Sequence, residues 1–157
     1  MHPEAAVTGL LCAGGGFLLA VLWFDLMFDV QVLVDNPSVA ALGSIAAYYR
    51  RVTTEASPMN YLVAAVMITT LAAGLVDLSR SRDRRGLRAV ALLLAAAPIG
   101  LALVRVVPNA MILGAETVDD AAQVALARSI LRDHLFCFAS IAAFLTLRLR
   151  LAAGERT

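Results

Sequence analysis

SILRDHLFCFASIAAFLTL, residues 129–147, is the stretch that decides the fold, because it is apolar enough for a lipid bilayer and yet carries charge. Its uncharged C-terminal part is too short to cross a hydrocarbon core of about 30 Å when a helix rises about 1.5 Å per residue. A spanning helix therefore takes Arg132, Asp133 and His134 into the membrane, roughly 21 to 24 Å above an inner boundary at Arg148. Ionisable groups at that depth are costly unless they face a bundle interior or a wet cavity, so we expect a functional site there.

Composition places the whole chain among membrane proteins. Hydrophobic residues make up 61% of the 157 residues, against roughly 45 to 50% in soluble domains, and they fall into four blocks separated by polar stretches. The net charge of +1 leaves no basic face for nucleic acid, which excludes that class of partner and leaves the lipid bilayer as the expected surroundings. The two cysteines, Cys12 and Cys137, form no C-x-x-C pair, which argues against a thiol oxidoreductase.

The four blocks predict an all-α fold, an integral membrane antiparallel four-helix bundle with a short outer interfacial helix, in a single membrane domain that covers residues 1–157. A span needs about 20 apolar residues. This places the spans at about 5–27, 59–77, 88–107 and 128–148, with the outer helix at about 38–51.

Local signals add detail to this fold. The small residues Gly14-Gly15-Gly16 allow a neighbouring helix to come close to the first span. Pro98 removes a hydrogen bond inside the third span, so the carbonyl that it frees needs another donor. Pro108-Asn109 ends or bends that span, and Asp119 or Asp120 suits the N-cap of the last helix. Asn36-Pro37-Ser38 is a turn and helix-start signal for the outer helix.

The orientation follows from a basic loop. Five arginines lie between Arg80 and Arg88, and under the positive-inside rule they place this loop in the cytoplasm. Two spans separate the loop from each terminus, so the N- and C-termini are predicted to be cytoplasmic too, and the connections 30–58 and 108–127 to face outward. We expect the protein in a bacterial inner membrane.

The outer helix ends in Tyr48-Tyr49-Arg50-Arg51, which allows two interpretations. The tyrosines suit a membrane interface, where their amphipathic rings anchor a helix. Alternatively, Tyr48 and Tyr49 stack on a ligand while the two arginines hold its carboxylate or phosphate.

Counting along the spans brings polar side chains from four segments to one depth in the outer leaflet. Asp25 and Asp29 lie four residues apart on the first span and therefore share a face. The other members of this constellation are Asn60, Arg105, Asn109, Ser129, Arg132, Asp133 and His134. On the last span, Ser129, Asp133, Cys137 and Ser140 form a polar stripe expected to point inward, with His134 about 100° away from Asp133.

The constellation has a structural and a functional interpretation. In the structural one, Arg105 neutralises Asp25 or Asp29, while Arg132 and Asp133 pair elsewhere. In the functional one, Asp133 and His134 act as acid and base in a pocket open to the outer leaflet, and Arg105 orients an anionic or phenolic substrate. The other residues at this depth (Asn109, Asp25, Asp29, Arg132, Tyr48 and Tyr49) are candidate substrate-binding residues.

No metal or other cofactor is predicted. Asp25, Asp29 and His134 offer oxygen and imidazole ligands, but the chain contains no H-x-x-x-H or E-x-x-H pair. A bis-histidine haem is unsupported, since His2 and His134 fall on opposite sides of the membrane.

Two runs in the C-terminal third carry a resemblance: Arg105-Val106-Val107-Pro108-Asn109, and later Ala127-Arg128-Ser129-Ile130-Leu131-Arg132-Asp133-His134. They resemble the second half of small four-span bacterial proteins of unknown function and are more distantly similar to the anthrone-oxygenase-like family. That family has a Pro-Asn segment after its third span and an Arg/His-bearing start to its fourth. The resemblance implies cofactor-independent oxygenation of a phenolic or polyketide-like substrate, with Asn109 and His134 as the positions carried over.

The sequence therefore predicts a polytopic membrane protein with an outer-leaflet polar pocket that binds a hydrophobic small molecule, with or without turnover. The alternative is a non-catalytic accessory or assembly subunit of a larger membrane complex, or a homo-oligomer, whose Ala- and Gly-rich faces pack against partner helices. A transporter is disfavoured, because four short spans without evident inverted repeats would need dimerisation to build a pathway.

Overall fold

The computed structural model describes residues 3–35, 37–80 and 84–154, and the secondary structure within these residues is entirely helical. The all-α prediction is thus confirmed for the described part of the chain. The elements, which include one 3-10 and two π-helical segments, are α1 (Pro3–Asp29), η1 (Val30–Leu33), α2 (Val39–Arg50), η2 (Arg51–Glu55), α3 (Ser57–Arg80), α4 (Arg85–Leu101), η3 (Ala102–Val106), α5 (Val107–Ala115) and α6 (Asp120–Gly154).

Four helical stretches are long and apolar enough to cross a membrane: Glu4–Leu33, Pro58–Arg80, Arg85–Ala115 and Asp120–Gly154. Each of them contains one of the four predicted spans. The shorter helix α2 occupies the range expected for the outer helix, and η2 prolongs it to Glu55.

The ends of the helices follow the signals in the sequence, with one exception. Ser38 Oγ accepts a hydrogen bond from the Ala41 N–H (3.2 Å) at the start of α2, and Asp119 Oδ1 accepts one from the Ala122 N–H (2.8 Å) at the start of α6. Both residues are N-caps, as predicted, while Asn36 lies outside the described residues. Pro108 does not end the third long helix, which continues from the π-helical segment η3 directly into α5 and on to Ala115.

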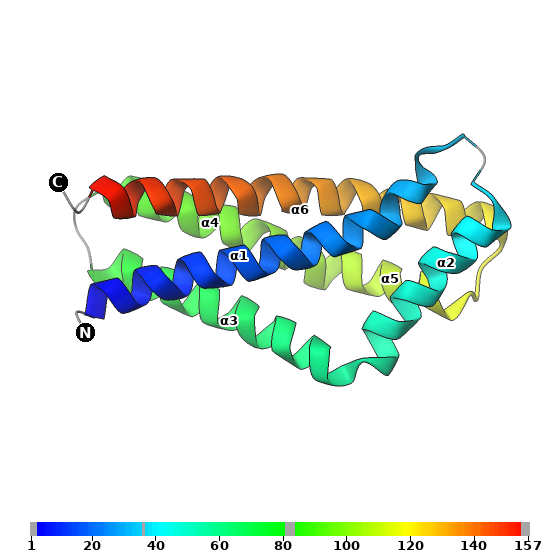
Figure 1. The fold of residues 1–157 in the computed structure, drawn as a ribbon, viewed down its shortest axis with the longest axis horizontal. Helices are drawn as coiled ribbons and strands as arrows, with labels where there is room; N and C mark the ends of the chain where they lie inside the picture. Colours follow the sequence, from blue (N-terminus) through cyan, green and yellow to red (C-terminus); the bar gives the residue numbers. More distant parts are fainter. Residues whose placement is uncertain (1–2, 36, 81–83, 155–157) are drawn as a thin grey trace.

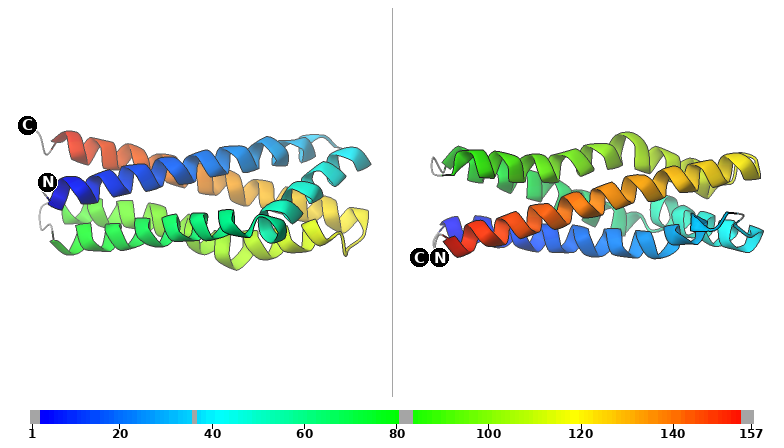
Figure 2. Two further views of the ribbon diagram at one scale, coloured as in Figure 1. Left: turned by 60° about the horizontal axis from the view of Figure 1, so that its bottom comes forward. Right: turned by 90° about the horizontal axis from the view of Figure 1, so that it is seen from above.

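The long helices pack side by side. α1 packs against α3 and α6, and α4 packs against the same two helices. The start of α1 and the end of α6 lie at one end of the molecule, here called the proximal end (Figure 1). α2 and the connection from α5 to α6 lie at the opposite, distal end, where α2 packs against α5 (Figures 1 and 2).

Small residues set the distance between these helices. A Cβ at Gly14 would lie 2.1 Å from Thr70 Oγ1 on α3, and a Cβ at Gly15 would lie 2.8 Å from Phe144 Cε1 on α6. The two glycines therefore make room for side chains of the neighbouring helices, and nothing lies within 4 Å of a Cβ at Gly16. At the distal end, a Cβ at Gly114 would lie 2.6 Å from the backbone nitrogen of Arg50, so α5 and α2 are in backbone contact there.

The proline at position 98 is the reason for a hydrogen bond between α4 and α6. Proline has no N–H to give to the carbonyl four residues before it, which belongs to Leu94. That carbonyl accepts a hydrogen bond from Ser140 Oγ instead, at 2.8 Å, so the expected replacement donor is found on α6. The backbone then widens into the π-helical segment η3, a local feature common beside irregular positions in a helix.

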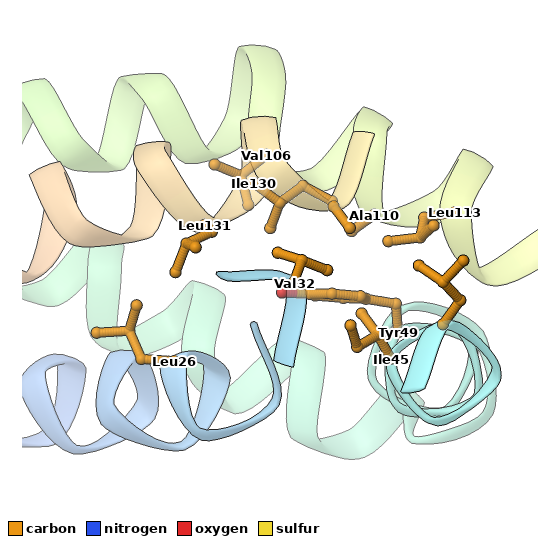
Figure 3. Packing of buried hydrophobic residues seen from close by; sticks show 11 residues of the cluster. Leu26, Val32, Ile45, Tyr49, Val106, Ala110, Leu113, Ile130 and Leu131 are labelled. Carbon is orange, nitrogen blue, oxygen red and sulfur yellow. The ribbon is translucent and has the colours of Figure 1, made fainter. Parts of the chain in front are cut away.

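The largest group of buried apolar side chains fills the distal end, where α1, α2, α5 and α6 meet (Figure 3). Val32, Ile45, Leu113 and Ile130 are almost completely buried in it. Tyr49 is also a member, and its hydroxyl is the polar atom that this core has to accommodate. The distal core therefore fixes α2 against the ends of the long helices.

Candidate functional site

Five predicted residues meet at the border between the distal core and the middle of the molecule. Asp25 and Asp29 project from successive turns of α1, Tyr48 and Tyr49 from α2, and His134 from α6. We call these five side chains the polar cluster. They come from three helices that are far apart in sequence, so tertiary packing brings them together.

Asp29 is the centre of the polar cluster. It is completely buried, and both of its carboxylate oxygens accept hydrogen bonds: Oδ1 from the Tyr49 hydroxyl at 2.5 Å and Oδ2 from His134 Nδ1 at 2.6 Å. The bond to a carboxylate places a proton on Nδ1, which leaves Nε2 of a neutral imidazole as an acceptor. Asp29 thus fixes the orientation of the imidazole, as the carboxylate does in a Ser-His-Asp triad.

Asp25 lies one turn towards the proximal end and faces the other side of the imidazole. Its Oδ1 accepts a hydrogen bond from the Tyr48 hydroxyl at 2.5 Å, and Tyr48 stacks on Phe28 with ring centroids 4.1 Å apart. Its Oδ2 lies 3.8 Å from His134 Nε2, beyond hydrogen-bond distance. His134 Nε2 is therefore directed towards a carboxylate that it does not bond.

The two phenols act as donors in this arrangement. Burial, the largest cause, raises the pKa of Tyr48 above the ordinary value of 10.0, and the neighbouring Asp25 raises it further. Burial and the adjacent Asp29 likewise raise the pKa of Tyr49. Both hydroxyl groups consequently keep their protons at neutral pH and donate them to the two carboxylates.

Next to the polar cluster lies a cavity of about 560 Å³ in the distal half of the molecule. Along α1 its lining runs from Leu18 to Phe28, so the charged side chains come at its distal end. Asn60 and Thr53 are further polar residues in a lining that is otherwise mostly apolar. The lining residues are Leu18, Val21, Leu22, Phe24, Asp25, Phe28, Tyr48, Tyr49, Val52, Thr53, Met59, Asn60, Val63, Ala64, Met67, Pro98, Ile99, Ala102, Leu103, Val106, Val107, Ala110, His134, Cys137 and Ile141.

Asp133 and Arg105 form a separate pair, outside this cavity. Arg105 Nε lies 3.0 Å from Asp133 Oδ2, and Arg105 also donates a hydrogen bond to Ser129 Oγ at 3.1 Å. The structural interpretation paired Arg105 with Asp25 or Asp29, and this expectation has to be corrected. Because His134 points away from Asp133 around α6, the aspartates of α1 pair with the histidine, and the arginine is left for Asp133.

The polar stripe on α6 lies in the same contact, between α6 and the segment formed by α4 and η3, as the pair of Arg105 and Asp133. Ser129 and Asp133 meet Arg105, Cys137 Sγ lies 3.7 Å from the Pro98 carbonyl oxygen, and Ser140 bonds Leu94. Asp133, Cys137 and Ser140 are buried, so the stripe points inward as expected. It joins α6 to α4 and η3.

The remaining predicted residues are placed as follows. Arg132 is exposed, and Asn109 is half-buried; neither lines the cavity. The tyrosine hydroxyls are directed into the protein, since Tyr49 is 2% exposed and Tyr48 donates to Asp25. The arginines that follow them are not directed at the cavity but pair with glutamates. Arg50 Nη2 lies 3.3 Å from Glu116 Oε1, and Arg51 Nε lies 3.7 Å from Glu55 Oε2.

A buried ion cluster at the proximal end was not foreseen. Asp77 accepts hydrogen bonds from Arg88 and from Arg148, the latter at 2.6 Å, and all three side chains are buried. In the topology predicted from the sequence, Arg88 and Arg148 are charges at a membrane boundary. The signal that could have revealed the cluster is a single carboxylate, Asp77, at the end of an apolar block and opposite several arginines.

Within residues 3–35, 37–80 and 84–154, no group of three or more His, Cys, Asp or Glu side chains is arranged to hold a metal ion. Comparisons of the chain with protein families, with curated proteins and with solved structures give no match.

Proposed function

We propose that this chain is an integral membrane protein that binds a hydrophobic small molecule in the cavity beside the polar cluster. The four long apolar helices support insertion as an antiparallel bundle. Exposed arginines at the proximal end (Arg80, Arg84, Arg85 and Arg150) support a cytoplasmic location for that end and both termini. The distal end, with the cavity and the polar cluster, then belongs to the outer leaflet of a bacterial inner membrane.

The lining of the cavity is the observation that carries this function. A volume of about 560 Å³ is within the range of small-molecule sites, roughly 300 to 1,000 Å³. Such sites combine a mostly apolar wall with a few convergent polar groups that orient the ligand. Here the apolar wall would hold the body of the ligand, and Asp25, Tyr48 and His134 would hold its polar group.

The edges of the cavity support access from the lipid. Phe24 and Met59 are 60% and 53% exposed, and Leu103 on the opposite wall is 62% exposed. In a bilayer these apolar side chains would contact acyl chains, so a ligand dissolved in the membrane could reach the cavity sideways. A hydrophobic ligand loses little by exchanging lipid for such a wall, which leaves its polar group to determine specificity.

His134 is the side chain placed to act on the ligand. The residue lines the cavity, Asp29 holds its Nδ1 side, and Nε2 lies 3.8 Å from Asp25 Oδ2. A base held in this way can accept a proton from a bound polar group. Asp133 would stabilise only the packing of α6. Asn109 and Arg132 would take no part in binding the ligand.

An uncharged fluorescent probe tests the binding function. N-phenyl-1-naphthylamine is titrated into the purified protein in dodecyl maltoside, and its fluorescence is compared with that in micelles without protein. We expect a saturable signal that Ala64→Phe, a substitution on the cavity wall, weakens by at least about fivefold. Ala65→Phe is the matched control, since Ala65 is also exposed on α3 and does not line the cavity.

The same preparation tests the alternative, an accessory subunit. No saturable signal, together with a fixed polypeptide partner that co-purifies with the chain, would overturn the proposal. Equal weakening by the two phenylalanine substitutions would show that the probe binds elsewhere.

A further inference from the structure

The geometry points to a lipophilic amine, bound as its ammonium ion, as the class of ligand that the cavity takes. This inference rests on the proposed binding function and deepens it. It is carried by the balance of charge at the polar end of the cavity and by the hydrogen bonds left open there.

Charge is the first argument. Asp25 lines the cavity, and the buried Asp29 lies directly behind His134. Two carboxylates therefore face one imidazole, and no arginine lines the cavity, while lysine is absent from the chain. Arg105, which the sequence predicts to orient the substrate, is engaged by Asp133 outside the cavity. An anionic ligand would meet a like charge with nothing to neutralise it, whereas a cation completes the balance.

The open hydrogen bonds are the second argument. His134 is 5% exposed and lines the cavity, and its Nε2 makes no hydrogen bond among the described residues. When the imidazole is neutral and its proton is on Nδ1, this nitrogen is an acceptor. Asp25 Oδ2, at 3.8 Å, is a second acceptor, since the Tyr48 hydroxyl bonds the other oxygen.

Two acceptors at this separation fit one nitrogen that carries several hydrogens. An ammonium nitrogen about 2.8 Å from each of them would donate to both at once, and a charge-assisted bond to a carboxylate is roughly twice as strong as a neutral one. A hydroxyl or a phenol has a single hydrogen to donate and would leave one buried acceptor without a partner. The geometry thus favours a primary or secondary amine over an alcohol of the same shape.

Three probes with one ring system test this ligand class. Equilibrium dialysis at neutral pH, in dodecyl maltoside with a protein-free micelle blank, compares 2-naphthylmethylamine, 2-naphthylmethanol and 2-naphthoate. An alkylamine is protonated at neutral pH, as a lysine side chain is. We expect the amine to bind at least about tenfold more tightly than the alcohol, and the carboxylate to bind most weakly.

Asp25→Asn supplies the second measurement. It should remove the preference for the amine over the alcohol, because the amide has no negative charge and offers one acceptor oxygen in place of two. Asp35→Asn is the control, since Asp35 is exposed and does not line the cavity.

The possible failures can be distinguished. Binding of the alcohol or the carboxylate at least as tight as that of the amine would overturn the ammonium inference and leave the binding function standing. If none of the three probes binds and N-phenyl-1-naphthylamine gives no signal either, both the ammonium inference and the binding function are overturned. If Asp25→Asn fails to fold, the order of the three probes on the unaltered chain still decides.

Discussion

Asp29 Oδ2 lies 2.6 Å from His134 Nδ1, which joins the first and the last helix of the chain across 105 residues of sequence. The carboxylate is completely buried and is also bonded by Tyr49. One side chain thus ties together α1, α2 and α6 and sets the orientation of the imidazole that lines the cavity. This relationship leads to the first of five predictions.

Asp29→Asn should destabilise the protein and disorient His134. The amide keeps the shape of the carboxylate but offers one acceptor in place of two, and a hydrogen bond to a charged group contributes about 1.5 to 3 kcal/mol. Thermal unfolding in detergent measures the loss. Asp35→Asn, at an exposed carboxylate of the same end, should leave the melting temperature unchanged; equal effects of the two substitutions would refute the central role of Asp29.

Alkaline titration should leave Tyr48 and Tyr49 protonated when the pH rises from about 9 to about 11. The pKa of each phenol is raised in the folded protein, so its contribution to stability is complete below the unfolded-state pKa of about 10 and is lost as pH rises towards the folded-state value. Absorbance at 295 nm follows ionisation. The amplitude in this range should be the same for the double variant Tyr48→Phe/Tyr49→Phe as for the native chain, and a large drop in the variant would contradict the prediction.

Arg148→Gln should lower the free energy of unfolding by about 3 kcal/mol, because it leaves the buried Asp77 with one of its two hydrogen-bonded arginines missing. Arg150→Gln, two residues further along the same helix at an exposed position, should change it by less than about 0.5 kcal/mol. Denaturation of the two variants in parallel gives the comparison. A cost at Arg148 no larger than that at Arg150 would mean that the ion cluster is not structural.

Gly114→Ala should destabilise the distal core by about 1 to 3 kcal/mol, because the new methyl group meets the backbone of Arg50 and a backbone cannot rotate away. Gly43→Ala is the control on the partner helix. No atom lies within 4 Å of a Cβ there, and alanine is the better helix former by about 1 kcal/mol. The two substitutions should therefore shift the melting temperature in opposite directions.

Ser140→Ala should cost about 1 to 2 kcal/mol, because it leaves the Leu94 carbonyl without its donor. In a Pro98→Ala background the same change should cost much less, since alanine returns a backbone N–H to that carbonyl. A double-mutant cycle measures the difference. Additive effects of the two substitutions would show that proline and serine act independently.

That Asp25, Asp29 and His134 lie at a similar height in the bundle could be predicted from the sequence, because height along a helix is a matter of counting residues. Counting brought Asp25, Asp29 and His134 to one level, and these side chains do meet. The same holds for helix starts such as Ser38, where the signal is local.

The partners within the cluster could not be predicted, because they depend on how each helix is rotated about its own axis. Asp133 and His134 are neighbours about 100° apart on a helix, and both flanks of that helix are apolar enough to be buried. Only packing against α1 and η3 decides that His134 faces the aspartates and that Asp133 faces Arg105. The buried Asp77 was missed for a related reason, since a charge near a helix end is equally compatible with solvent and with a partner on another helix.

The hydrogen bond between Ser140 and Leu94 also has a consequence for how the chain is made. The two residues are 46 positions apart, and at about 5 to 20 residues per second a ribosome needs roughly 2 to 9 seconds to reach the serine after the leucine. In the membrane that we propose, α4 would spend this interval with an unsatisfied carbonyl. Newly made α4 is therefore expected to stay close to the insertion machinery, or to water, until α6 arrives to complete it.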